Sequence, residues 1–131
     1  MNRIEIQDSI KQLLARKNEI VFAYLFGSFV GEVTYNDIDV AIYIDPKKYK
    51  KILASKIAYD IKLALEIEKE TKNTVDLIIM NNAPDHLIYS ISAGLLIVNR
   101  HDDLRVDFIT QSWARYFDFK YQRDMYLQNV L

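Results

Sequence analysis

The chain has 131 residues, of which 50% are apolar and 27% charged, and its formal net charge is −1 at pH 7. This composition is typical of a globular domain large enough to bury its own core. The charge argues against a general nucleic-acid binder, which would carry a basic excess, and the absence of cysteine excludes disulfides and zinc–thiolate sites.

No secretory signal and no membrane span are predicted. The first residues, Met1–Ile6, carry charges and contain no apolar core region. The longest unbroken apolar run, Ile20–Phe26, is too short to cross a bilayer. We therefore expect a cytoplasmic protein without a membrane partner, built as one domain over residues 1–131 with a helical tail at about 103–131.

The first predicted elements are an amphipathic helix over residues 3–17 and a buried strand at Ile20–Phe26. The strand assignment rests on a short, continuous run of aromatic and β-branched side chains. Gly27-Ser28 ends this strand, and a polar loop follows. A second strand is expected at Ile38–Ile44, closed by Asp45-Pro46.

A single long helix from about Lys47 to Lys69 is predicted next, because apolar residues recur along one of its faces. That face comprises Tyr49, Ile52, Leu53, Ile57, Ile61, Ala64 and Leu65. A third strand follows at Thr74–Met80. The intervening helix has the length of a crossover connection, so the second and third strands are expected to be parallel neighbours.

The C-terminal third is predicted to contain a short helix from Pro84 to about Ser92, stopped by Gly94, and a strand at Leu95–Val98. From Asp103 onward the chain is helical, either unbroken or interrupted near Phe117-Asp118. The order of elements indicates an α/β (α+β) fold, a small mixed sheet flanked by helices.

Three aspartates stand out within this pattern. Asp37 and Asp39 lie two residues apart, so a strand presents both on one face, where they repel each other unless a cation lies between them. Asp76 lies near the start of the third strand, beside Asp39 if the two strands are neighbours. Such a cluster would hold two magnesium ions, which prefer hard oxygen ligands, and would activate an attacking hydroxyl.

The turn after the first strand suggests a phosphate site. Gly27 allows backbone to come close to a phosphate group, and Ser28 offers both a hydroxyl and an amide hydrogen.

These motifs occur in an order that resembles a known superfamily. Leu25–Ser28, then Asn36–Val40, then Val75–Leu77 are similar to the signature of the DNA polymerase beta nucleotidyltransferases. The chain resembles more closely their minimal branch, the MNT-type antitoxins that pair with HEPN-domain toxins. The order of elements matches over nearly the whole chain, and the tail at Trp113–Phe119 is also similar.

The resemblance implies a role for each matched residue. Gly27 and Ser28 would bind the phosphates of ATP, Asp37 and Asp39 would be metal ligands, and Asp76 would be a third carboxylate that helps to deprotonate the acceptor. The implied reaction transfers AMP from ATP, with Mg²⁺, to a tyrosine of a partner HEPN toxin, and so neutralises it.

Two departures from the family pattern keep other functions open. Only eight residues, Phe29 to Asn36, separate Gly-Ser from the first aspartate, which is fewer than usual, and Phe29–Glu32 lacks the arginine often found there. One alternative is therefore a weak or inactive domain that inhibits its partner by binding. The other is a nucleotidyltransferase that acts on a small molecule or, against the charge balance, on nucleic acid.

Other polar residues are interpreted as surface groups or left open. His86 and His101 are expected on the surface, outside the carboxylate cluster. Arg100 either reaches a phosphate or pairs with nearby acids, which are expected at the start of the last helix. A solvated helix face explains Lys47, Lys48, Lys50 and Lys51 better than a phosphate site does. The acids near Arg100 are Asp102, Asp103 and Asp107.

The C-terminal tail is unusually aromatic. Its rings either cover the sheet as core or form part of a partner surface, for which aromatic residues are favoured. They are Phe108, Trp113, Tyr116, Phe117, Phe119, Tyr121 and Tyr126.

Overall fold

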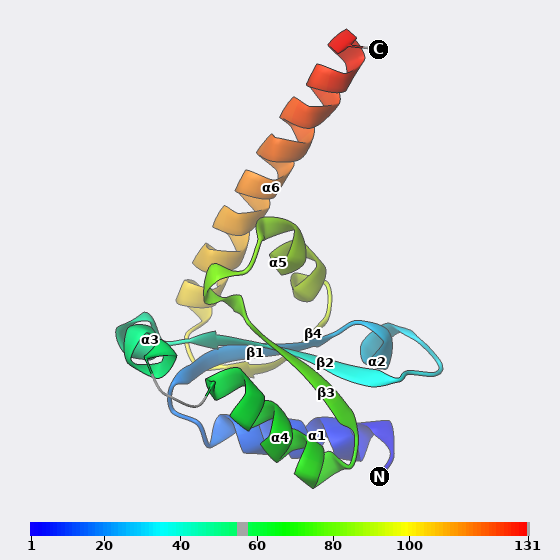
Figure 1. The fold of residues 1–131 in the computed structure, drawn as a ribbon, viewed down its shortest axis with the longest axis vertical. Helices are drawn as coiled ribbons and strands as arrows, with labels where there is room; N and C mark the ends of the chain where they lie inside the picture. Colours follow the sequence, from blue (N-terminus) through cyan, green and yellow to red (C-terminus); the bar gives the residue numbers. More distant parts are fainter. Residues whose placement is uncertain (55–57, 131) are drawn as a thin grey trace.

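A four-stranded mixed sheet organises the chain in the computed structural model, which describes residues 1–54 and 58–130 (Figure 1). The order across the sheet is β3-β2-β1-β4, and β1 runs antiparallel to both of its neighbours. β2 and β3 are parallel neighbours, as predicted. The strands are β1 (Ile20–Phe26), β2 (Asp37–Ile44), β3 (Thr74–Ile79) and β4 (Leu95–Asn99).

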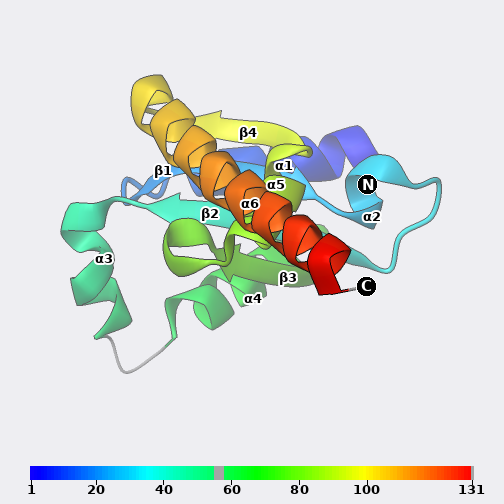
Figure 2. The ribbon, with the colours of Figure 1, turned by 90° about the horizontal axis from the view of Figure 1, so that it is seen from above.

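Helices cover both faces of this sheet. α1 and α4 lie on one face, whereas α5 and the first half of α6 lie on the other, and the second half of α6 rises away from the body (Figure 1, Figure 2). The helical elements are α1 (Arg3–Ala15), α2 (Ser28–Gly31), α3 (Pro46–Leu53), α4 (Tyr59–Thr71), the 3₁₀ turn η1 (Met80–Asn82), α5 (Asp85–Ser92) and α6 (Asp102–Val130).

Strand alternation divides the interior into two cores. Because successive side chains point to opposite faces, Ile38, Val40 and Ile42 pack in the core under α1 and α4. Ala41 and Tyr43 pack in the core under α5 and α6. The ring of Tyr43 stacks on Phe22 at 4.7 Å between centroids. Both faces of the sheet centre are therefore apolar.

The prediction of a single helix over Lys47–Lys69 is wrong, because this stretch forms the two helices α3 and α4. The side chain of Asp45 accepts from Lys47 N at the start of α3, and the helix ends at Leu53, with Ala54 as its C-cap. Ala58 is extended, with φ −57° and ψ 120°, before α4 begins. The expected face residue Ile57 lies outside the described residues. Apolar spacing did not separate the two helices, because side chains of both pack against the same core.

A helix in the loop after Gly27 was not predicted, and the question whether the last helix is broken is answered. The loop after Gly27 begins with the short helix α2, and α6 runs unbroken from Asp102 to Val130. Every described residue of α6 beyond Tyr116 is exposed. Within residues 1–54 and 58–130, no helix combines the length and the apolarity needed to cross a membrane.

A polar anchor holds α6 to α5. The buried hydroxyl of Ser112 donates to Asp85 Oδ1 at 2.7 Å, and Arg115 donates from Nε to Asp85 Oδ2 at 3.1 Å. The hydrogen bond from Arg115 lowers the pKa of the Asp85 carboxyl, that from Ser112 adds to the effect, and partial burial opposes both. The charged form of Asp85 therefore stabilises the fold.

Replacing Asp85 with Asn is expected to lower the free energy of unfolding by about 1 kcal/mol near neutral pH, since Arg115 is exposed and water screens the pair. Because folding lowers the pKa of Asp85, the deficit is present above the ordinary carboxyl pKa of about 4 and disappears as the pH falls through the lower folded-state value. Thermal unfolding across this pH range measures the difference. Asp118→Asn, at an exposed site farther along α6, is the control. A deficit that persists unchanged in acid would contradict the assignment.

Candidate active site

Strand register brings the predicted carboxylates together. Asp39 on β2 is paired on one side with Phe26, the last residue of β1, and on the other with Asp76 of β3. Asp37 lies two residues earlier on β2, opposite Thr74. The expectation that Asp76 lies beside Asp39 is confirmed.

The three carboxylates also share a face of the sheet. Asp37 and Asp39 alternate with Ile38 and Val40, whose side chains enter the core under α1 and α4. Asp76 likewise lies between Val75 and Leu77, which point into that same core. The carboxylates therefore lie on the α5 side. Asp37 and Asp76 are exposed and Asp39 is half-buried, so a ligand from solvent reaches all of them.

Gly27 packs directly against this cluster. Its φ of +74° lies in a region that L side chains rarely adopt, and a Cβ atom there would come within 2.1 Å of Asp39 Oδ2. Glycine is thus required twice, for the backbone conformation and for the space. The chain turns here from β1 into α2, and Ser28 is the first residue of that helix.

The charge balance of the cluster is unfavourable by itself. Burial raises the pKa of the Asp39 carboxyl, and the neighbouring charges of Asp76 and Asp37 raise it further. A cation bound among these groups would reverse the effect, because it favours the ionised form.

The carboxylates suit Mg²⁺ in chemistry and position, since they are hard oxygen donors on one accessible face beside a glycine turn. In the described part of the chain, however, no group of three or more His, Asp or Glu side chains is gathered closely enough to hold a metal ion. The exposed side chains of Asp37 and Asp76 would have to turn toward Asp39 around an ion. The metal-ligand role of the three aspartates stays a prediction.

The other polar residues lie away from the cluster. Arg100 donates from Nε to the carbonyl oxygen of Ile20 at 2.9 Å and from Nη2 to that of Ala15, so it joins α1 to β1. In the described structure its guanidinium therefore binds main-chain oxygens, and neither a phosphate site nor the nearby acids. His101 Nδ1 accepts from Leu104 N at 3.1 Å and caps α6. His86 is exposed, and the surface prediction for both histidines is confirmed. Lys47, Lys48, Lys50 and Lys51 are exposed on α3, as expected for a solvated helix face.

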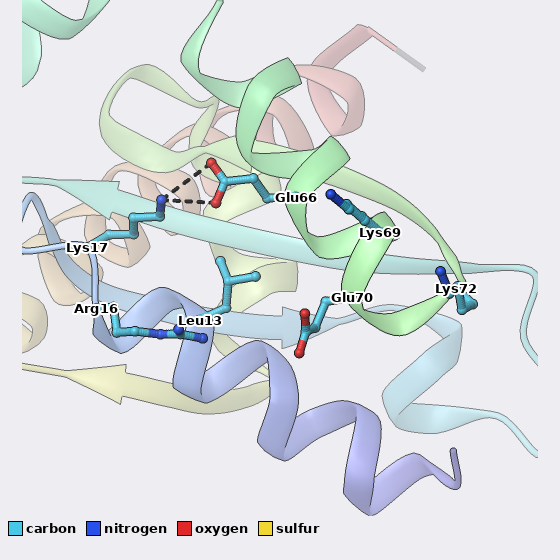
Figure 3. Close-up of a pocket in the computed structure, with 7 residues that line it drawn as sticks. All are labelled: Leu13, Arg16, Lys17, Glu66, Lys69, Glu70 and Lys72. Carbon is cyan, nitrogen blue, oxygen red and sulfur yellow. Dashed lines mark hydrogen bonds and ion pairs between the residues drawn. The ribbon is translucent and has the colours of Figure 1, made fainter.

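A cavity of about 460 Å³ lies between α1 and α4, on the face of the sheet opposite the carboxylates (Figure 3). Lys17 Nζ pairs with Glu66 Oε2 at 3.0 Å across it. The cavity is lined by charged side chains and one apolar side chain, and none of the predicted site residues lines it. The lining residues are Leu13, Arg16, Lys17, Glu66, Lys69, Glu70 and Lys72.

The sequence motifs missed two features next to the site. α2 was expected as irregular loop, although its carbonyl–amide bonds close the turn, with Val30 N and Gly31 N both donating to Gly27 O at 3.1 Å. Arg3, which contacts this turn from α1, was not singled out at all. No local pattern marks a contact between residues so far apart in the sequence.

A family comparison identifies this arrangement. The model of the polymerase beta nucleotidyltransferase family matches residues 8–103, a span that contains Gly27, Ser28 and all three aspartates. The chain belongs to this family. The resemblance of the motifs to the DNA polymerase beta nucleotidyltransferases is thereby confirmed.

Solved structures extend the likeness to the whole chain. A chain in the rebuilt structure of the tri-AMPylated Shewanella oneidensis HEPN toxin in complex with MNT antitoxin is 19% identical, with a TM-score of 0.70 and 98% of each chain covered. A chain in a toxin–antitoxin structure with AMP-PNP is 19% identical, with a TM-score of 0.70 and 95% and 97% covered. A chain in the MntA–HepT toxin–antitoxin structure is 18% identical, with a TM-score of 0.68 and 97% of each chain covered.

These likenesses establish a shared fold, and the predicted small mixed sheet with a helical tail is confirmed. A search of curated protein sequences gave no match.

Substituting Gly27 with Ala is expected to destabilise the protein by about 2–3 kcal/mol, because the new Cβ overlaps the Asp39 carboxylate and the positive φ strains any L residue. Chemical denaturation measures the loss. Gly31→Ala is the matched control, since a Cβ at Gly31 meets nothing within 4 Å.

A second comparison separates the two causes. In an Asp39→Ala background the overlap is removed and only the backbone strain remains, so Gly27→Ala should cost markedly less there. Equal costs in both backgrounds would show that Gly27 and Asp39 do not contact each other.

Proposed function

We propose that this protein is an MNT-type antitoxin that transfers AMP from ATP to a tyrosine hydroxyl of a HEPN-domain toxin. The observation that carries the proposal is the position of Asp39, between Asp37 and Asp76 and directly against the Gly27 turn. Membership of the nucleotidyltransferase family supports it. Among proteins of this fold, one structure holds a tri-AMPylated HEPN toxin and another holds AMP-PNP.

The reaction is an in-line displacement at phosphorus. The tyrosine oxygen attacks the α-phosphorus of ATP, the bond to the bridging oxygen of the β-phosphate breaks, and pyrophosphate leaves while the phenolic proton is released. Mg²⁺ ions, when bound, would neutralise the triphosphate and stabilise the negative charge that leaves with pyrophosphate.

Each site residue has a position suited to one part of this reaction. The Gly27 backbone leaves room for a phosphate to approach, and Ser28 offers its hydroxyl and its amide. Asp37 and Asp39 project from one strand as the proposed metal ligands. Asp76, exposed on the outer strand β3, is the proposed base that takes the phenolic proton.

The projecting segment of α6, residues 117–130, is the proposed docking surface for the toxin. The stripe of α6 that packs on the body, at Ile109, Ser112 and Tyr116, continues past it at the same alternating spacing of three and four residues. Its continuation is Phe119, Arg123, Tyr126 and Val130. Phe119, Tyr126 and Val130 are at least 60% exposed, so the stripe is an apolar seam without a covering element in the described structure.

The charge in this seam favours a different protein over a second copy of this chain. Arg123 lies in the middle of the stripe, and its Nη2 is 3.5 Å from Asp124 Oδ1 in an exposed ion pair that water screens. Pairing of two identical seams would bring two such cations together, whereas a toxin helix with a carboxylate opposite Arg123 would neutralise the charge. We therefore assign the seam to a HEPN toxin helix with an apolar face and one acidic residue.

The catalytic proposal is tested with purified protein, α-labelled ATP, Mg²⁺ and a co-encoded HEPN protein. Label is expected on a toxin tyrosine. Asp39→Asn and Asp76→Asn should each reduce labelling by about 10²- to 10⁴-fold, the range for loss of an acid–base or charge-stabilising group. Asp8→Asn, at an exposed position of α1, is the matched control and should label as the wild type does.

The alternatives give different results. A stable complex that inhibits the toxin without labelling it would indicate an antitoxin that acts by steric contact alone. Release of pyrophosphate without label on the toxin would indicate another acceptor, such as a small molecule or a nucleic acid.

The docking proposal is tested by binding of the same HEPN protein to variants of the projecting segment. Tyr126→Asp is expected to weaken the complex by more than about tenfold, because it places a charge in the apolar seam. Gln128→Asp introduces the same charge on the opposite side of the helix, about 180° around the axis from the seam, and should bind normally. Isothermal titration calorimetry distinguishes them, and equal affinities would remove α6 from the interface.

A further inference from the structure

The guanidinium of Arg3, in the first turn of α1, reaches across to the turn that follows β1. It donates from Nη1 to the carbonyl oxygen of Phe29 in α2 and from Nη2 to that of Val33 at 2.5 Å. These two acceptors lie on either side of the point where α2 ends and the chain turns back toward β2. One planar side chain therefore bridges the helix and the loop.

The same guanidinium also lies over two aromatic rings. Its central carbon is 5.5 Å from the ring centroid of Phe29 and 4.7 Å from that of Tyr35. The two rings meet edge to face at 4.8 Å. Arg3 thus contacts both the backbone and the side chains of residues 28–36, and cation–π attraction adds to the hydrogen bonds.

The contacts continue to the start of β3. The hydroxyl of Tyr35 donates to Asn73 Oδ1 at 3.4 Å, and Asn73 Nδ2 donates to the carbonyl oxygen of Thr71 at 2.7 Å. Thr74, the next residue, is paired with Asp37. Arg3 is therefore connected to both ends of the loop that joins Ser28 to the carboxylates.

The stretch between the buried Phe29 and the half-buried Tyr35 needs such a tether because it has little burial of its own. Val33 is 94% exposed, and residues 32–34 are all exposed, yet the carbonyl oxygen of Val33 is held by Arg3. An exposed segment without tertiary hydrogen bonds samples many conformations, and fixing it lowers the entropy that a ligand must otherwise remove on binding.

We infer that Arg3 is a positioning residue for the nucleotide: it holds the segment from Ser28 to Asn36 in the conformation that receives the triphosphate, without touching the reacting atoms. The inference rests on the proposed nucleotidyltransferase function. It extends the site to α1, on the other face of the sheet.

The test compares Arg3→Ala and Arg3→Lys with the wild type in two measurements. Hydrogen exchange should show faster exchange of the amides of residues 28–36 in Arg3→Ala. The KM for ATP should rise by about tenfold while kcat changes by less than about threefold, since the lost hydrogen bonds order the site before the chemical step. Arg3→Lys keeps the charge over the rings but lacks the planar fork, so intermediate values are expected.

Arg16→Ala is the matched control, because Arg16 directly follows the same helix as its C-cap and donates from Nε to Gln12 O of α1. It should leave exchange and KM unchanged. Unaltered exchange at residues 28–36 in Arg3→Ala, or a fall in kcat at constant KM, would overturn the inference. If the wild type neither binds nor turns over ATP, the proposed function fails and the nucleotide role of Arg3 with it, whereas the exchange comparison still decides whether Arg3 orders the loop.

Discussion

The contact between the Gly27 backbone and the Asp39 carboxylate is the constraint on which the site depends. It requires that β1 end opposite Asp39 and that the chain leave the strand with a positive φ, so that Ser28 starts a helix beside the carboxylates. The register is enforced from within the sheet, since a slip of one residue along β2 would turn Ile38 and Val40 out of the core and the aspartates into it. An apolar core thus fixes the position of a polar site.

This arrangement places mutually repelling carboxylates on neighbouring strands, beside an apolar core. Asp39 is partly desolvated and has two acidic neighbours, and both effects raise its pKa. The charged cluster therefore does not stabilise the folded chain by itself. Groups that weaken the isolated fold and are complemented by a ligand are typical of functional sites. The surrounding strands supply the stability that this cluster lacks.

The strands and the cluster were predictable because both depend on local patterns. The run Ile20–Phe26 and the parallel neighbours β2 and β3 follow from composition and connection length, and Asp37, Asp39 and Asp76 follow from alternation within those strands. The division of the expected long helix into α3 and α4 was not predictable, since both halves carry compatible apolar spacing. Arg3 and Arg100 were also missed or left open, because each binds main-chain carbonyl oxygens of distant residues, which no side-chain pattern in the sequence records.

The two halves of α6 serve different purposes: the first half stabilises the fold, and the second half is the proposed binding surface. Its first half is bound to the body through Ser112 and Asp85, whereas residues 117–130 contribute to neither core. Substitutions beyond Phe117, whose ring contacts Tyr89 of α5, therefore carry little folding cost. Under the proposed docking, the toxin-binding surface can therefore diverge between related antitoxins while the sheet and its carboxylates stay the same. Changes in a few turns of helix would then be enough to keep each of two antitoxins in one cell from binding the other's toxin.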